Sequence, residues 1–111
     1  MTLVAEFQTV AKVEDIPDGG MRQFIAHGEP VGVYRVGETV YAISDICSHE
    51  ETFLTEGEFD VDELEVECHL HGSRFNVSNG EVRILPAIKP VATYDVRVEN
   101  GLVLIGPRNE R

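Results

Sequence analysis

Turn residues recur so often along this chain that no long helix fits between them. An Asn-Gly pair at 100–101 separates an alternating run of apolar and polar residues, 92–99, from a second apolar run, 102–105. The pairs Gly-Glu at 37–38 and Asn-Gly at 79–80 stand between similar short runs. Asn-Gly pairs favour the tight turns of β-hairpins, and alternation with a period of two is typical of strands. The sequence therefore predicts an all-β protein of short antiparallel strands, arranged as a sandwich or barrel.

One short helical turn is the only other regular element that the sequence predicts. It lies around residues 13–16, and Pro17 with the two glycines at 19–20 ends it. No longer window has helical periodicity. The chain has 111 residues, of which 42% are hydrophobic and 26% charged, so we expect a single domain, 1–111, with a modest core.

The charge balance excludes some classes of partner. Twenty acidic residues against nine Lys and Arg give a formal net charge of -11. This charge argues against nucleic acid and anionic membranes, which would repel the protein, and favours a partner with a basic face. No apolar run is long enough to span a membrane, and the first ten residues do not resemble a secretion signal. We therefore expect a soluble, cytoplasmic protein that binds neither nucleic acid nor membrane.

Nearly half of the acidic residues lie in one segment. Residues 50–67 contain nine Asp and Glu and no Lys or Arg. Two compatible interpretations are a solvated face that keeps the protein soluble and an electric field that attracts a basic partner. Within this segment, alternation over 63–68 places Leu64 and Val66 on one side. That pattern predicts a strand with an acidic outer face, ending at Cys68.

The two cysteines each precede a histidine by two or three positions. Cys47 is followed by His49, and Cys68 by His71. Two such loops supply two thiolates and two imidazoles, the ligand number that a tetrahedral ion or a small iron–sulfur cluster needs. A disulfide, separate buried thiols and a structural zinc ion are the alternatives. Zinc motifs more often pair cysteine with cysteine and histidine with histidine, which favours a cluster.

The two cysteine segments resemble the cluster loops of the Rieske family. That family has Cys-x-His, a spacer, and then Cys-x-x-His-Gly followed by a small residue, and this chain has CSHE at 47–50 and CHLHGS at 68–73. The segment LPAIKP at 85–90 is similar to the family's proline-containing third loop. The resemblance covers nearly the whole chain and is strongest to small Rieske ferredoxins, which feed electrons to aromatic-ring-hydroxylating oxygenases.

The resemblance implies one Rieske-type [2Fe-2S] cluster and a role for each motif residue. By analogy Cys47 and Cys68 hold the inner iron, and His49 and His71 hold the outer iron. Gly72 and Ser73 complete the cofactor-binding residues. A glycine allows close approach of the backbone to the cluster, and the matching serine of the family can donate to a bridging sulfide. His69 falls at a variable position of the motif and is expected not to be a ligand.

The resemblance also predicts how the domain is divided. The cluster-binding subdomain with its two ligand loops is expected to span about 45–80. It is inserted in a basal β domain formed by about 1–44 and 81–111.

Departures from the respiratory members of the family predict a low reduction potential. Those proteins carry a further cysteine in each loop, and the matching residues here are Thr52 and Leu70, so no bracing disulfide is possible. They also have a tyrosine that donates to a ligand cysteine, and Phe75 stands at that position. Fewer donors around the cluster disfavour its reduced state, so we expect a potential in the lower part of the Rieske range.

The function that these features predict is one-electron transfer. The chain is expected to be a monomeric ferredoxin of aromatic hydrocarbon catabolism. It would dock transiently and electrostatically on a ferredoxin reductase, a flavoprotein, and on a terminal oxygenase. No catalytic residues stand out, so the chain itself is not expected to be an enzyme. The alternatives are a Rieske-like small subunit of a larger oxidoreductase, such as assimilatory nitrite reductase, and a structural zinc domain that binds a protein.

Overall fold

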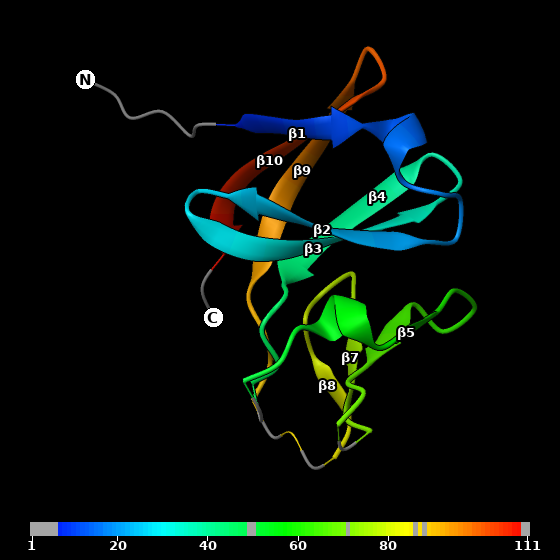
Figure 1. Ribbon diagram of the computed structural model, residues 1–111, viewed down its shortest axis with the longest axis vertical. Coiled ribbons are helices and arrows are strands. Elements are labelled where there is room, and N and C mark those ends of the chain that lie inside the picture. Colours follow the sequence, from blue (N-terminus) through cyan, green and yellow to red (C-terminus); the bar gives the residue numbers. More distant parts are fainter. Residues whose placement is uncertain (1–6, 49–50, 71, 86, 88, 110–111) are drawn as a thin grey trace.

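A computed structural model describes residues 7–48, 51–70, 72–85, 87 and 89–109, and it contains two antiparallel sheets (Figure 1). The larger sheet has six strands, in the order β1 (Gln8–Lys12), β10 (Leu102–Asn109), β9 (Thr93–Glu99), β4 (Thr39–Ser44), β3 (Glu29–Val36) and β2 (Met21–Ala26). The smaller sheet has four, in the order β5 (Glu58–Asp60), β6 (Glu65–Glu67), β7 (Arg74–Asn76) and β8 (Val82–Ile84). The expectation of an all-β, antiparallel fold is confirmed.

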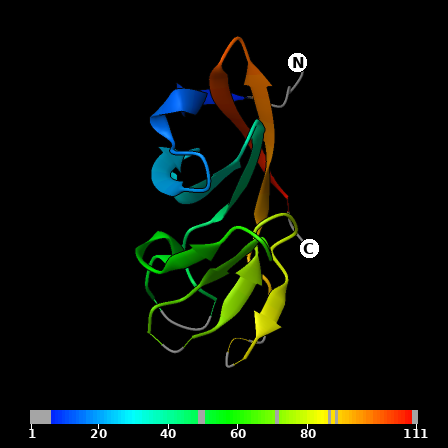
Figure 2. The ribbon, with the colours of Figure 1, turned by 90° about the vertical axis from the view of Figure 1, so that its right-hand side faces the viewer.

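The two sheets lie at opposite ends of an elongated molecule of 41 × 32 × 18 Å. Figures 1 and 2 both show the six-stranded sheet in the upper half and the four-stranded sheet in the lower half. The chain passes from β4 into the lower half and returns to the upper half at β9 (Figure 2). The smaller sheet is thus formed by the segment between β4 and β9, which are both strands of the larger sheet.

The three predicted hairpins are present, and their turns have the backbone that the sequence requires. Asn100 (φ 52°) and Gly101 (φ 76°) join β9 to β10. Both are left-handed, as a tight turn that follows the twist of its strands demands. Gly37 (φ 62°) lies between β3 and β4, and Gly80 (φ 77°) lies between β7 and β8. The predicted helical turn is the 3-10 helix η1 (Val13–Asp15).

Two groups of buried apolar side chains form the core. One combines residues of the six-stranded sheet, such as Val33 and Ile105, with Ile16 after the first helical turn. The other joins the two sheets, because it combines Tyr34 and Ile43 of the larger sheet with residues of the smaller sheet and its loops. The complete buried set of this second group is Tyr34, Ile43, Cys47, Leu54, Val66, Cys68, Phe75, Val77, Ala87 and Val91. Both cysteines therefore belong to the core that holds the two sheets together.

The acidic strand predicted at 63–68 is shorter than expected, and one of its acidic residues is buried. Only Glu65–Glu67 form β6, and Leu64 has a positive φ of 56° in the preceding turn. Val66 is buried as predicted, but Glu65 is also buried rather than solvated. Its carboxylate lies 3.2 Å from Arg74 Nη1 and 3.3 Å from Arg83 Nε. The sequence segment holds no base, yet β7 and β8 supply two from the neighbouring strands.

Candidate metal centre

The first cysteine lies in a short loop at the end of β4. The backbone N–H of Cys47 donates to Thr52 O (3.0 Å), and an isolated bridge pairs Ile46 with Phe53. The N–H of Leu54, which begins the 3-10 helix η2 (Leu54–Glu56), donates to Asp45 O (2.7 Å). The loop is closed at its base by these contacts, so the Cys47 thiol is held against the core.

The second cysteine lies in the hairpin between β6 and β7. Cys68 N–H donates to Ser73 O (2.7 Å), and Gly72 N–H donates to Cys68 O (3.0 Å). Gly72 has φ 78°, a left-handed conformation that glycine adopts without steric cost. The motif's glycine therefore closes the tight turn after Cys68, besides the role in cofactor approach that the resemblance implies.

Both thiols are buried side chains of one core group. Cys47 is 4% exposed and Cys68 is 1% exposed, both pack in the same core group, and no disulfide joins them. His49 and His71 lie outside the described residues, and within the described part no group of three metal-binding side chains occurs. Two buried thiols from two loops match the soft ligands that iron–sulfur clusters use, so the described residues fit such a group.

Ser73 joins the second loop to the third. Its side chain is fully buried, and Oγ accepts a hydrogen bond from Ala87 N (2.9 Å). A hydroxyl that accepts one bond still has its own hydrogen to donate, as the predicted bond to a sulfide would need. Ala87 lies in the predicted third loop, within 85–90, whose positions 86 and 88 are outside the described residues.

The imidazole of His69 contacts polar side chains, which supports the expectation that it is not a ligand. Its Nε2 lies 2.9 Å from Thr52 Oγ1 and 3.3 Å from Glu56 Oε1. Thr52 is one of the two positions where respiratory Rieske proteins carry the extra cysteine. A polar contact thus links the two ligand loops in the region where those proteins have a disulfide.

Sequence reasoning missed one buried charged residue beside the first loop. Asp45 is fully buried, and its carboxylate accepts hydrogen bonds from Thr55 N (2.9 Å), Thr55 Oγ1 (2.6 Å) and Gln23 Nε2 (2.8 Å). Burial raises the pKa of Asp45, while the bonds from Thr55 and Gln23 act in the opposite direction. Asp45 follows directly on the run TVYAIS of β4, and no residue spacing marks it as buried.

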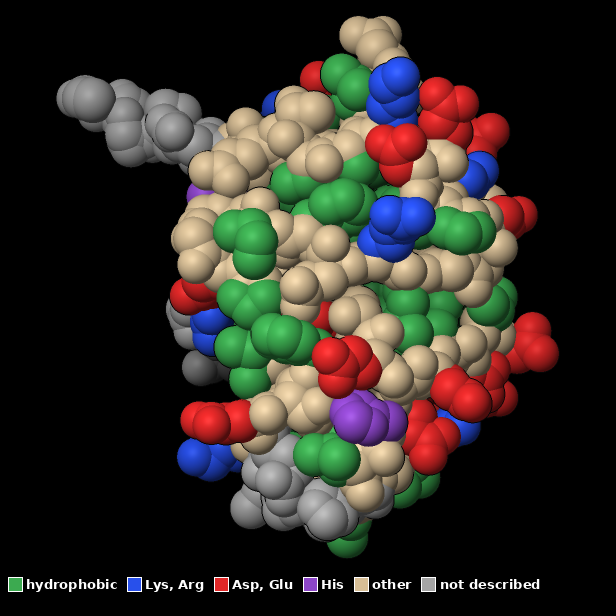
Figure 3. Space-filling model, viewed as in Figure 1, with side chains coloured by type: hydrophobic (Ala, Val, Ile, Leu, Met, Phe, Trp, Pro, Cys, Tyr) green, Lys and Arg blue, Asp and Glu red, His purple; other side chains and the backbone are tan. Residues whose placement is uncertain are grey.

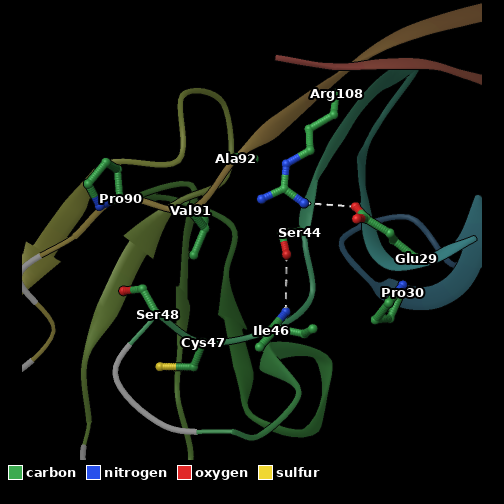
Figure 4. A pocket seen from close by; sticks show the side chains of 10 residues that line it. All are labelled: Glu29, Pro30, Ser44, Ile46, Cys47, Ser48, Pro90, Val91, Ala92 and Arg108. Carbon is green, nitrogen blue, oxygen red and sulfur yellow. Dashed lines mark hydrogen bonds and ion pairs between the residues drawn. The ribbon is translucent and has the colours of Figure 1, made fainter. Parts of the chain in front are cut away.

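A pocket of about 290 Å³ separates the first loop from the larger sheet. Figure 4 shows Cys47 and Ser48 on one side of it, with Arg108 facing Glu29 on the other. Arg108 Nη1 lies 2.7 Å from Glu29 Oε1, which also accepts a bond from the Tyr94 hydroxyl (2.7 Å). These two contacts, that with Tyr94 first, lower the pKa of Glu29. Arg108 and Glu29 on this side of the pocket therefore form an ion pair with each other.

Comparison with known proteins decides which family has this arrangement. The model of the Rieske [2Fe-2S] domain matches residues 6–95, which include both cysteine loops. The chain belongs to the Rieske family. As a Rieske domain it takes a Rieske-type [2Fe-2S] cluster, and the family assignment favours this cluster over a single zinc ion.

The relatives of this Rieske domain at 35–40% identity include ferredoxins of dioxygenases. It is 38% identical to the 3-phenylpropionate/cinnamic acid dioxygenase ferredoxin subunit of Shigella flexneri serotype 5b over 84% of this chain and 86% of that protein. The ferredoxin of carbazole 1,9a-dioxygenase from Nocardioides aromaticivorans IC177 is 40% identical, with a TM-score of 0.89 over 91% of this chain and 97% of that one. A ferredoxin in complex with the reduced oxygenase of carbazole 1,9a-dioxygenase is 35% identical, with a TM-score of 0.83 over 90% and 92%.

The described helices of this Rieske domain are single 3-10 turns. None of them has the length or apolar character needed to cross a membrane.

Proposed function

We propose that this chain is a one-electron carrier between a flavin-dependent ferredoxin reductase and the terminal oxygenase of a ring-hydroxylating system. The observation that carries this proposal is the pair of buried, unlinked thiols in the two motif loops of a Rieske domain. Relatives 38% and 40% identical are named as a ferredoxin subunit and a ferredoxin of dioxygenases, and another was solved with its oxygenase. The chain itself is then an electron-transfer component and not an enzyme.

The relatives favour this function over the alternatives. Both a small subunit of a nitrite reductase and a free ferredoxin would contain a Rieske-like fold, so the fold alone does not separate them. The names of the more similar relatives favour the ferredoxin. A monomeric state and a cytoplasmic location stay predictions.

The proposed ligands are the four motif residues. Cys47 and Cys68 would hold one iron, and His49 and His71 the other, with Gly72 and Ser73 beside them. When bound, the cluster supplies a site that accepts and releases one electron. Neutral imidazole in place of two thiolates makes the centre easier to reduce than an all-cysteine cluster. Burial of both cysteines supports their assignment, because it keeps water from the thiolate side.

The proposed subdomain of about 45–80 would carry these ligands, on a basal domain of about 1–44 and 81–111. The segregation of the strands into two sheets supports this division. β8, at Val82–Ile84, nevertheless belongs to the smaller sheet, so residues 81–84 pack with the subdomain.

A surface beside the first loop has the properties of a transient docking site. The bridge between Ile46 and Phe53 places two apolar side chains next to each other, and they are 43% and 38% exposed. They line a shallow pocket of about 380 Å³ with Glu51, Thr52 and Glu56. Figure 3 shows apolar side chains gathered on this face where the two sheets meet, with acidic side chains below them. A partner that offers an apolar side chain surrounded by Lys or Arg would fit.

Neutralising the rim of this pocket is expected to slow electron transfer from the reductase. Glu51→Gln combined with Glu56→Gln should reduce the second-order rate constant several-fold at low salt, because electrostatic steering is lost. Raising the ionic strength from 0.01 to 0.15 M should slow the wild type more than the double variant, since the Debye length shrinks from about 30 to about 8 Å. Stopped-flow reduction of the cluster measures both rates.

The matched control removes two exposed acids from the other end of the molecule. Glu14→Gln combined with Glu38→Gln has the same change of net charge but lies at the larger sheet. It should behave like the wild type. If the wild-type rate does not respond to salt, and both double variants match it, the acidic segment serves solubility alone.

The reduction potential is expected in the lower part of the Rieske range, at about -150 to 0 mV. Phe75 is fully buried in the core group that contains both cysteines, and it stands where the respiratory members have their tyrosine. Phe75→Tyr should therefore raise the potential if its O–H donates to Cys47 or Cys68. Protein-film voltammetry gives both values, and a wild-type potential above about +200 mV would contradict the ferredoxin assignment.

A further inference from the structure

We infer that Asp45 is a fixed negative charge beside the first ligand loop and that it lowers the reduction potential of the cluster. The inference rests on the proposed ligand role of Cys47. Asp45 is a positioning residue as well, because its backbone accepts the N–H of Leu54 (2.7 Å) and donates to Pro30 O (3.1 Å). These bonds hold both ends of the loop that contains Cys47.

The surroundings of the Asp45 carboxylate are those of an ionised group. The Thr55 backbone N–H (2.9 Å to Oδ1) and the Gln23 amide nitrogen (2.8 Å to Oδ2) only donate, and the Thr55 hydroxyl also reaches Oδ2 (2.6 Å). Of these groups only the Thr55 hydroxyl could accept the hydrogen of a protonated acid, and its 2.6 Å contact has the length of a bond donated to an ionised oxygen. Three donors directed at two oxygens are the arrangement that stabilises a buried carboxylate.

The Tyr34 hydroxyl lies in the same buried space. A Cβ built on Gly32 would be 3.0 Å from both Asp45 Oδ1 and Tyr34 Oη, so the two oxygens border the same glycine. Tyr34 is fully buried, and its hydroxyl has no hydrogen-bond partner among the described residues. Burial first, and then the negative charge of Asp45, raise the pKa of Tyr34. Both groups thus lie away from bulk solvent, where a charge is screened less than at the surface.

Asp45 lies close to Cys47, the proposed ligand of the first loop. Asp45 precedes Cys47 by two positions, which limits the distance between their Cα atoms to about 7 Å. The core group around Cys47 includes Tyr34, Ile43 and Leu54, all fully buried, so little water intervenes to screen the charge. A fixed anion in such surroundings disfavours the arrival of an electron. It thus lowers the potential.

An exposed carboxylate nearby should have much less influence. Glu56 belongs to η2, directly after Thr55, but its side chain is 58% exposed. Water and salt screen charges at the surface far more than charges in the interior. The potential should accordingly depend on one buried carboxylate more than on the surface charge that dominates the formal total of -11.

The test compares the midpoint potentials of Asp45→Asn and Glu56→Gln in the cluster-loaded protein. Each variant removes one negative charge from the same region. We expect Asp45→Asn to raise the potential by several times the shift of Glu56→Gln, with the paramagnetic resonance spectrum of the reduced cluster retained. Thr55→Val removes a donor but keeps the charge, so it should not raise the potential. Equal upward shifts in Asp45→Asn and Thr55→Val would show a structural effect and overturn the inference.

A second variant decides the matter if Asp45→Asn does not take up the cluster. Gln23 is exposed apart from its bond to Asp45, and Gln23→Lys places an ammonium group next to the intact carboxylate. It should raise the potential relative to Thr9→Lys, which adds the same charge at an exposed position of β1. Equal potentials in these two lysine variants, or an unshifted loaded Asp45→Asn, would overturn the role of Asp45. Wild-type protein without iron would instead overturn the proposed function, and this inference with it.

Discussion

Replacing Cys68 by serine is expected to give a protein without a [2Fe-2S] cluster. The wild type should contain two irons and two acid-labile sulfides per chain and show a mixed-ligand paramagnetic resonance signal when reduced. Cys68 is 1% exposed in the core group that joins the two sheets, so a replacement ligand would have to enter that core. Iron and sulfide analysis of anaerobically purified protein measures the loss.

His69→Ala is the control for this substitution. His69 stands next to Cys68 in the sequence, but its imidazole contacts Thr52 and Glu56. The variant should keep its iron, its sulfide and a nearly unchanged spectrum. A single zinc in place of iron in the wild type would refute the cluster, and loss of iron in His69→Ala would refute our assignment of the outer ligands.

Gly80→Ala is expected to destabilise the protein strongly. A Cβ at this position would lie 2.1 Å from Val91 O, a backbone atom that cannot move aside cheaply. Gly80 O accepts the N–H of Val91 (2.9 Å), and Val91 shortly precedes β9. The clash would therefore separate the β7–β8 hairpin from the chain that returns to the larger sheet. Overpacking of this kind costs about 1–3 kcal/mol in addition to the cost of a left-handed alanine.

Gly28→Ala separates the cost of the steric clash from the cost of a left-handed alanine. Gly28 has φ 78° and Gly80 has φ 77°, but no atom lies within 4 Å of a Cβ built on Gly28. The alanine at 28 should cost only the backbone strain, about 1–2 kcal/mol. The thermal midpoint of the cluster-loaded protein, followed by its visible absorbance, should fall at least twice as far for Gly80→Ala. Equal decreases would mean that the loop shifts to accept the methyl group.

The sequence determined those features that depend on neighbouring residues. The Asn-Gly pair at 100–101 requires two left-handed residues and so predicts its hairpin without knowledge of the rest of the chain. The spacing of Cys47 and Cys68 from their histidines likewise predicts two ligand loops, because a metal site needs those residue types within a few positions of each other. Both cysteines are buried in one core group, and their role as ligands stays a prediction.

Only the tertiary structure decided which charges are neutralised and which are exposed. Residues 50–67 contain no base, yet Glu65 is buried between Arg74 and Arg83, which strand pairing brings from elsewhere in the chain. Asp45 follows an ordinary strand, and its donors come from Gln23, 22 residues earlier, and Thr55, 10 residues later. Burial and hydrogen bonding of a carboxylate depend on contacts between distant segments, and the spacing of residues along the sequence does not indicate such contacts. The sequence pattern therefore predicts where a cluster binds, whereas only the packing shows which carboxylates are buried and which groups they contact.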